Sequence, residues 1–145
     1  MVVELRAVAK GNEGVGTRDQ QQLRLLEACV ARLRDCVIIA EVGEDGRPNI
    51  VYVNDAFVER TGYARDEVIG HTPAILHGPG TQPEAIARIE HALVSGHAHR
   101  EEILSYTKHG EPLWLELDVA PVADASGRIT HWISVERDIT SRKAV

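Results

Sequence analysis

Five stretches of the chain carry the hydrophobic pattern of β-strands, in which residues alternate between two faces or form a short apolar run. They span residues 37–42, 50–53, 99–107, 112–122 and 129–138. Glu44, Asp45 and Gly46 separate the first two stretches and predict a hairpin turn. We therefore expect a five-stranded antiparallel sheet.

The last three strands carry apolar residues on both faces. Leu113 and Leu117 fall on one face of the fourth strand, and Trp114 falls on the other. An antiparallel sheet with one face in water would not need this arrangement. We expect short helices on one face. The other face has apolar residues at Leu104, Tyr106, Trp114, Ile133 and Val135, and it needs a lid from the N-terminal helix, a partner chain or both.

A helical spacing precedes the first strand. Thr17 followed by Gln20 fits a capping box, which predicts an amphipathic helix from Thr17 to about Leu33. Its apolar residues fall three or four apart, at Leu23, Leu26, Val30 and Leu33. This stripe packs either on its own domain or on a second copy of the chain, and the pattern leaves both readings open.

Short helices fill the region between the second and third strands. Asn54 and Asp55 are predicted to cap a helix that Gly62 ends, because glycine tolerates the left-handed conformation of a helix end. Thr81 is predicted to cap a longer helix from about Pro83 to Ser95. The inner face of that helix carries Ile86, Ile89 and Leu93.

Composition narrows the class of protein. The chain has 145 residues, 43% of them hydrophobic, which suits one domain with a core. Its net charge of −6 disfavours nucleic acid as a partner. No apolar run is long enough to span a membrane, so we predict no membrane contact by this chain. Cys29 and Cys36 lie among apolar residues and are predicted to be buried free thiols in a reducing cytoplasm.

The predicted organisation has four parts. Residues 1–16 are a flexible leader and residues 17–35 are the N-terminal amphipathic helix. Residues 36–140 form the domain, and residues 141–145 begin a linker.

Catalytic and metal-binding patterns are weak. The sequence has no nucleophile elbow, no metalloprotease helix and no kinase nucleotide motif, so we predict that this chain is not an enzyme. His97 and His99 would make a pair of imidazoles without a third ligand, so we predict no metal site.

Several short motifs carry a family resemblance. They are NDAF at 54–57, TGY at 61–63, EVIG at 67–70, GP at 78–79, YTKHGEPLW at 106–114, PV at 121–122, DASG at 124–127 and RDIT at 137–140. Over residues 36–143 the chain resembles PAS domains, and among these it resembles the flavin-binding light-oxygen-voltage branch. The resemblance implies an α+β fold with a five-stranded antiparallel sheet, short helices on one face and the added N-terminal helix.

The positions that hold flavin in that branch differ here. The photoreactive cysteine falls at Pro73, and the two phosphate-binding arginines fall at Ala74 and Glu90. The amide positions that read the ring fall at Ser105 and Leu115, the neighbouring asparagine at Thr72, and the sensing glutamine at Glu136. Because a flavin's polar groups would be left unmatched, we predict that no flavin is bound.

Other ligands were weighed on the same basis. A haem would use a histidine on the long helix, but His91 points away from the inner face of that helix, so no haem is expected. The prediction is therefore no cofactor, with a small metabolite as the open alternative. The pocket candidates are Thr72, Leu76, His77, Ser105, Leu115, Leu117 and Glu136. Burial would make Glu136 a proton-linked sensor, unless side chains fill the interior.

By resemblance, the chain is a sensory module of a bacterial sensor histidine kinase that acts as a homodimer with a C-terminal output domain. The alternatives are a sensor of a cyclic-dinucleotide synthase or phosphodiesterase, a flavin photoreceptor and a ligand-free dimerisation module. The candidates for dimerisation and signal transfer are Leu23, Leu26, Val30, Leu33, Trp114, Ile133, Val135 and Asp138.

Overall fold

The computed structural model describes residues 16–143, so the predicted leader falls almost wholly outside the described residues. The elements are α2 (Thr17–Arg32), β1 (Cys36–Val42), β2 (Pro48–Val53), α3 (Asp55–Thr61), α4 (Arg65–Val68), η1 (Pro73–Leu76), α5 (Pro83–Ser95), β3 (His99–Tyr106), β4 (Pro112–Ala123), β5 (Ile129–Asp138) and α6 (Thr140–Lys143). Their order confirms the predicted α+β class.

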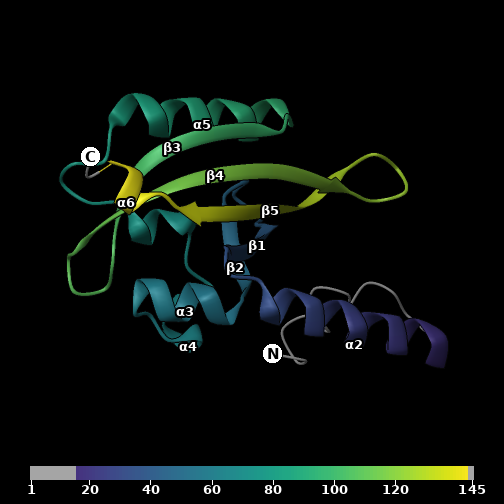
Figure 1. Ribbon diagram of the computed structural model, residues 1–145. Coiled ribbons are helices and arrows are strands. Elements are labelled where there is room, and N and C mark those ends of the chain that lie inside the picture. The colour runs from purple at the N-terminus through teal and green to yellow at the C-terminus, as the bar shows by residue number, and fades with distance from the viewer. Residues whose placement is uncertain (1–15, 144–145) are drawn as a thin grey trace.

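One sheet of five strands organises the domain. Its order is β2-β1-β5-β4-β3, and all neighbouring strands pair antiparallel. The first strand therefore lies beside the last, with Cys36 opposite Glu136 and Glu41 opposite His131. Figure 1 shows α5 running along β3 on one side and α3 with α4 below the sheet.

Two apolar clusters fill the inner face of the sheet. One lies under α3 and α4 and includes Phe57, Val68 and Leu115. The other lies under α5 and includes Ile103, Leu117 and Trp132. The alternation predicted for β4 is confirmed, since Leu113, Leu115, Leu117 and Val119 are all buried.

Helix α2 has two different faces. Leu23 and Val30 pack on Val37 and Tyr52, which lie on the outer face of β1 and β2. Leu25, Leu26 and Leu33 are 61%, 55% and 47% exposed. The packing on the domain's own sheet thus accounts for half of the predicted stripe, and the other half faces outward.

Three local predictions were wrong. Gly16, not Thr17, is the N-cap of α2, and Gln82, not Thr81, is the N-cap of α5. The Thr81 hydroxyl instead donates to the Leu104 carbonyl at 2.6 Å and accepts from the Gly78 N–H at 3.0 Å, so it ties a loop to β3. Cys29 is exposed because it lies on α2 away from the sheet, whereas Cys36 is buried as predicted.

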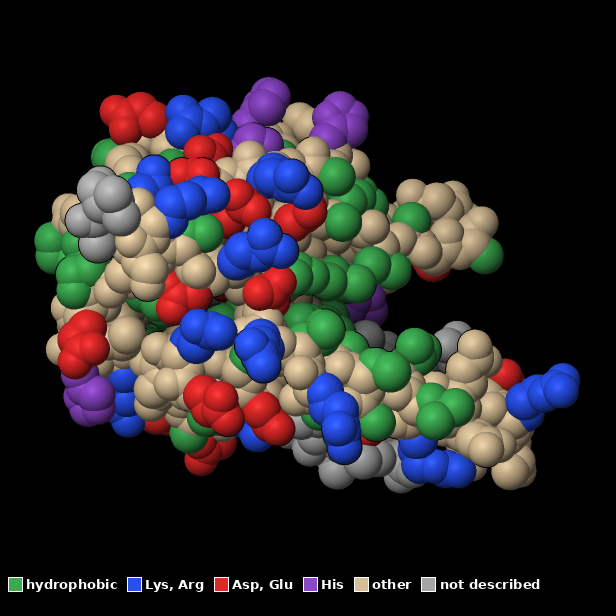
Figure 2. Space-filling view, in the orientation of Figure 1, with side chains coloured by type: hydrophobic (Ala, Val, Ile, Leu, Met, Phe, Trp, Pro, Cys, Tyr) green, Lys and Arg blue, Asp and Glu red, His purple; other side chains and the backbone are tan. Residues whose placement is uncertain are grey.

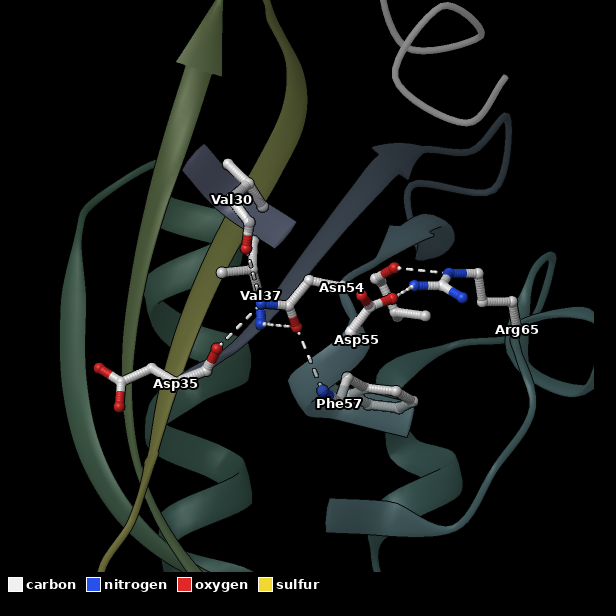
Figure 3. A network of polar contacts seen from close by, with 8 residues as sticks. Val30, Asp35, Val37, Asn54, Asp55, Phe57 and Arg65 are labelled. Carbon is white, nitrogen blue, oxygen red and sulfur yellow. Dashed lines mark hydrogen bonds and ion pairs between the residues drawn. The ribbon is translucent and has the colours of Figure 1, made fainter. Parts of the chain in front are cut away.

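The side chain of Asn54 joins three elements where the chain passes from α2 into β1 (Figure 3). It has no solvent exposure. Its oxygen accepts from the N–H groups of Val37 at 2.9 Å and Phe57 at 3.2 Å, so the predicted cap of α3 is confirmed. Its NH₂ group donates to the carbonyls of Val30 at 3.2 Å and Asp35 at 3.0 Å. One amide therefore fixes the end of α2, the start of β1 and the start of α3.

Replacing Asn54 should lower stability strongly. Asn54→Ala removes four hydrogen bonds at a buried site, so we expect the free energy of unfolding to fall by about 3 kcal/mol. Asn54→Asp should fall by a similar amount, because a carboxylate would face the two carbonyls that the amide donates to. Urea unfolding measures both.

Asn49→Ala, on β2 and half-buried, is the matched control and should cost less than about 1 kcal/mol. Equal losses at positions 49 and 54 would contradict a special role for the Asn54 amide.

Candidate functional site

A cavity of about 620 Å³ lies between α5, η1, the β1–β2 turn and the inner face of the sheet. Its volume is in the range of small-molecule pockets. The wall is mainly apolar and comes from several elements: Ile38, Ile86, Ile89, Leu93, Ile103 and Trp132. Side chains therefore leave a hollow between these elements, beside the packed clusters under α3, α4 and α5.

Six of the seven predicted pocket residues line this cavity. They are Thr72, Leu76, His77, Ser105, Leu117 and Glu136. Leu115 does not line it: this side chain is fully buried in the apolar cluster under α3 and α4. The position of Leu115 on the inner face of β4 is correct, but the cavity opens at the α5 end of that face. The roles of the six lining residues stay predictions.

Glu136 is the buried carboxyl group that lines this cavity. Its side chain is 3% exposed, and its Oε1 has no hydrogen-bond partner among the described residues. Its Oε2 accepts from the Ser134 hydroxyl at 3.4 Å, which is a weak bond. Burial raises the pKa of the Glu136 carboxyl to about 7, against a small lowering by Ser134. The carboxyl can therefore be a hydrogen-bond donor near neutral pH.

Cys36 lies opposite Glu136 across the β1–β5 ladder. Burial raises the pKa of its thiol to about 12, and the Glu136 carboxylate adds to the rise. Because the thiolate is the reactive form of cysteine, Cys36 is an inert core thiol. It belongs to the apolar cluster under α3 and α4, not to the cavity wall.

The rim of the cavity carries the other titratable groups. His77 is half-buried, and desolvation lowers the pKa of its imidazole while the Glu90 charge pulls it up. Arg47, in the β1–β2 turn, and Glu90, on α5, are both exposed at the rim. No sequence pattern predicted Arg47 at this rim, because nothing along the chain relates a hairpin turn to a helix 43 residues later.

Several wall residues were not predicted, and for two of them the pattern contained the signal. Trp132 shares its strand face with Glu136, and Ile89 belongs to the predicted inner face of the long helix. The alternation of the last strand predicts the position of Trp132, and the helical spacing predicts that of Ile89. Both residues reach the cavity once the long helix is placed over that end of the sheet.

The end of β5 is the second polar site. The Asp138 carboxylate accepts from Arg60 at 3.0 Å and from the Thr140 N–H at 3.0 Å. The Trp114 N–H donates to the Thr140 hydroxyl at 3.0 Å, and the Lys143 ammonium lies 4.8 Å from the centre of the Trp114 ring. Two signal-transfer candidates, Trp114 and Asp138, thus meet where the sheet passes into α6.

The remaining predicted residues are spread over the outer surface. Ile133 and Val135 are half-buried on the outer face of β5. His91 and His97 are exposed, and His99 is bonded to Glu101 at 2.9 Å. Within residues 16–143 no group of three or more His, Cys, Asp or Glu side chains is arranged to hold a metal ion. In the same range no helix has the length and apolarity to cross a membrane.

Comparison of the amino-acid sequence with known proteins identifies one family. A family model described as PAS domain matches residues 34–141. A blue-light-activated histidine kinase of Brucella anthropi is 40% identical over 91 residues, which is 63% of this chain and 18% of that protein. The chain therefore spans about a fifth of the length of this curated relative.

Two solved structures share the fold. The LOV domain of a blue-light activated histidine kinase from Erythrobacter litoralis EL346 is 30% identical with a TM-score of 0.68, covering 74% of this chain and 98% of that one. A structure described by the words "Flavin Analogue Sheds Light on Light-Oxygen-Voltage Domain Mechanism" is 26% identical with a TM-score of 0.74, covering 89% of this chain and 92% of that one.

These relatives contradict the prediction that the chain takes no cofactor and no flavin. That prediction rested on single positions such as Pro73 and Glu90, whereas the similarity extends over the whole domain and is to blue-light proteins, one of them described with a flavin analogue. The residues at these positions leave a cavity with a mainly apolar wall.

The raised pKa of Glu136 predicts that stability falls with rising pH. The folded protein keeps on Glu136 a proton that the unfolded chain releases near its ordinary pKa of 4.5. The stabilisation is complete below that pKa and is lost as the pH rises to about 7. Relative to Glu136→Gln, the wild type should lose up to about 3 kcal/mol of unfolding free energy between about pH 4 and about pH 8.

Urea unfolding across this pH range provides the measurement. Glu111→Gln, on the exposed β3–β4 turn, should keep the wild-type dependence. A wild-type slope that persists in Glu136→Gln would show that another group carries it.

Proposed function

Because this chain belongs to the PAS domain family and is a sensory module of a signalling protein, we propose that its parent is a sensor histidine kinase. We also propose that its cavity binds the ring of a flavin. A PAS domain is a sensory module and not itself an enzyme, so the kinase activity belongs to a C-terminal output domain. The cavity with the unpartnered Glu136 oxygen carries this proposal.

The residues that line the cavity fit the ring of a flavin. The volume and the apolar wall suit a flat ring, and the hydroxyl of Ser105 with the carboxyl of Glu136 offers polar contacts to its edge. No cysteine lines the cavity within residues 16–143. The residues present therefore fit a ring held by packing and hydrogen bonds. A flavin would supply a ring that changes its charge and hydrogen bonding with redox state.

Strand β5 would carry the state of the cavity outward. Glu136 faces the cavity, and Asp138, two residues later, holds α6 through the Thr140 N–H. Two states of the Glu136 contact would shift the end of β5 and the direction in which the chain leaves the domain.

Ligand binding tests this proposal directly. We expect purified protein titrated with riboflavin to quench flavin fluorescence and to gain melting temperature, because a ligand that binds the folded state alone stabilises it. Ile89→Phe, which puts bulk into the wall, should weaken binding at least about tenfold. Ala87→Phe, on the exposed side of α5, is the matched control and should bind as the wild type does.

The absence of both quenching and a thermal shift would overturn the flavin proposal. Equal binding by the two phenylalanine variants would place the ring outside this cavity.

A homodimer is the second part of the proposal. Leu25, Leu26 and Leu33 form an exposed apolar stripe on α2, and the half-buried Ile133 and Val135 lie on the outer face of β5. Figure 2 shows hydrophobic side chains on both sides of the notch between α2 and the β4–β5 hairpin. A second copy of the chain fits such a surface, because the same apolar patch on two copies is self-complementary.

Charged substitutions on this surface should weaken association. We expect Leu26→Glu and Ile133→Glu to raise the dimer dissociation constant at least about tenfold, because each buries an unpaired carboxylate in the contact. Light scattering over a concentration series gives the constant. Ile69 is an exposed apolar residue at the C-cap of α4, outside this surface. Ile69→Glu should therefore leave the dissociation constant unchanged. A wild-type chain that stays monomeric throughout would contradict the dimer.

A further inference from the structure

The ionisable groups around the cavity differ in burial and in charge. Two carboxyl groups line it: the buried Glu136, whose raised pKa favours the neutral form, and the exposed Glu90. Within residues 16–143, Arg47 is the one permanent cation among the lining residues. The imidazole of His77 adds little positive charge, because desolvation lowers its pKa. The Glu90 carboxylate is therefore the negative charge that an anion at the rim would meet.

Arg47 offers little fixed positive charge to an anion at the rim. The β1–β2 turn fixes its backbone: its N–H donates to the Asp45 carboxylate at 3.0 Å, and its carbonyl accepts from the Gly43 N–H at 2.8 Å. The side chain itself is exposed to solvent. A single exposed cation beside Asp45 is strongly screened and is not a built anion site.

Helix α5 adds to the negative field at the rim. The lining residues Leu93 and Val94 belong to its last turn, which ends at Ser95 with Gly96 as its C-cap. The C-terminal end of a helix carries partial negative charge, and no basic residue lies in this last turn to offset it. A dianionic phosphate at this rim would meet both the helix end and the Glu90 carboxylate.

We propose that this cavity selects an uncharged ring ligand and discriminates against one with a phosphate tail, so that riboflavin binds more tightly than flavin mononucleotide. This inference rests on the proposed flavin binding and names the ligand class of the same site. The ring would occupy the apolar interior under α5, and a neutral ribityl chain would leave through the rim beside Glu90 and Arg47.

A comparison of two flavins tests the selectivity. In low salt we expect the wild type to bind flavin mononucleotide at least about tenfold more weakly than riboflavin, by fluorescence quenching. Glu90→Gln keeps the shape of the side chain and removes its charge, so it should narrow the ratio. Glu90→Arg should narrow it further or reverse it. Glu84→Gln removes a carboxylate from the exposed first turn of the same helix and should keep the wild-type ratio.

Salt separates charge from shape in the same assay. Because the discrimination is electrostatic, raising the salt concentration should reduce the ratio for the wild type and change it less for Glu90→Gln. A ratio that ignores both salt and the charge at position 90 would overturn the proposal, since a steric preference would behave in that way.

The two levels of the proposal fail differently. Flavin mononucleotide that binds as tightly as riboflavin overturns the selectivity and leaves the flavin site standing. A protein that binds neither flavin, read by quenching and by melting temperature, overturns the flavin site and the selectivity together. Circular dichroism of each variant confirms that it is folded, so a lost signal is assigned to binding.

Discussion

The buried amide of Asn54 is the contact on which the arrangement of this domain depends. It satisfies two backbone N–H groups and two carbonyls from three elements, and no other single side chain can replace it, because only an amide both donates and accepts in this way. The bond to Val37 fixes the start of β1, whose next residue, Ile38, lines the cavity. The shape of the cavity is thus tied to the end of α2 through one side chain.

The first and last helices, α2 and α6, are attached to the domain by contacts of different strength. At the N-terminal end the Asn54 bonds are shielded from water, where a broken bond costs most. At the C-terminal end Arg142 and Lys143 pair with Glu102 at 2.7 Å on the surface, and exposed pairs of this kind contribute little. The surface ion pairs of α6 therefore add less to its attachment than the part-buried bonds of Thr140 to Trp114 and Asp138.

Sequence patterns predicted the elements better than their mutual placement. The period-2 alternation of β4 and the Asn54 cap depend on neighbours in sequence, and both were confirmed. The caps at Thr17 and Thr81 were misplaced by one residue, and the Thr81 hydroxyl bonds instead to Leu104 on β3. The cavity could be inferred only in part, because its size depends on how far α5 stands from the sheet. No local pattern encodes that distance.

The error about the cofactor has a physical cause that bears on other members of this family. A residue-by-residue test asks whether particular polar groups are present, and at Pro73 and Glu90 they are not. Binding of a ring depends first on an apolar volume, which Ile89, Ile103 and Trp132 provide from α5, β3 and β5. The residues at these polar positions leave the cavity open. The proposed ring site therefore depends on the apolar wall, and the proposed preference for a neutral tail depends on the charge at the rim.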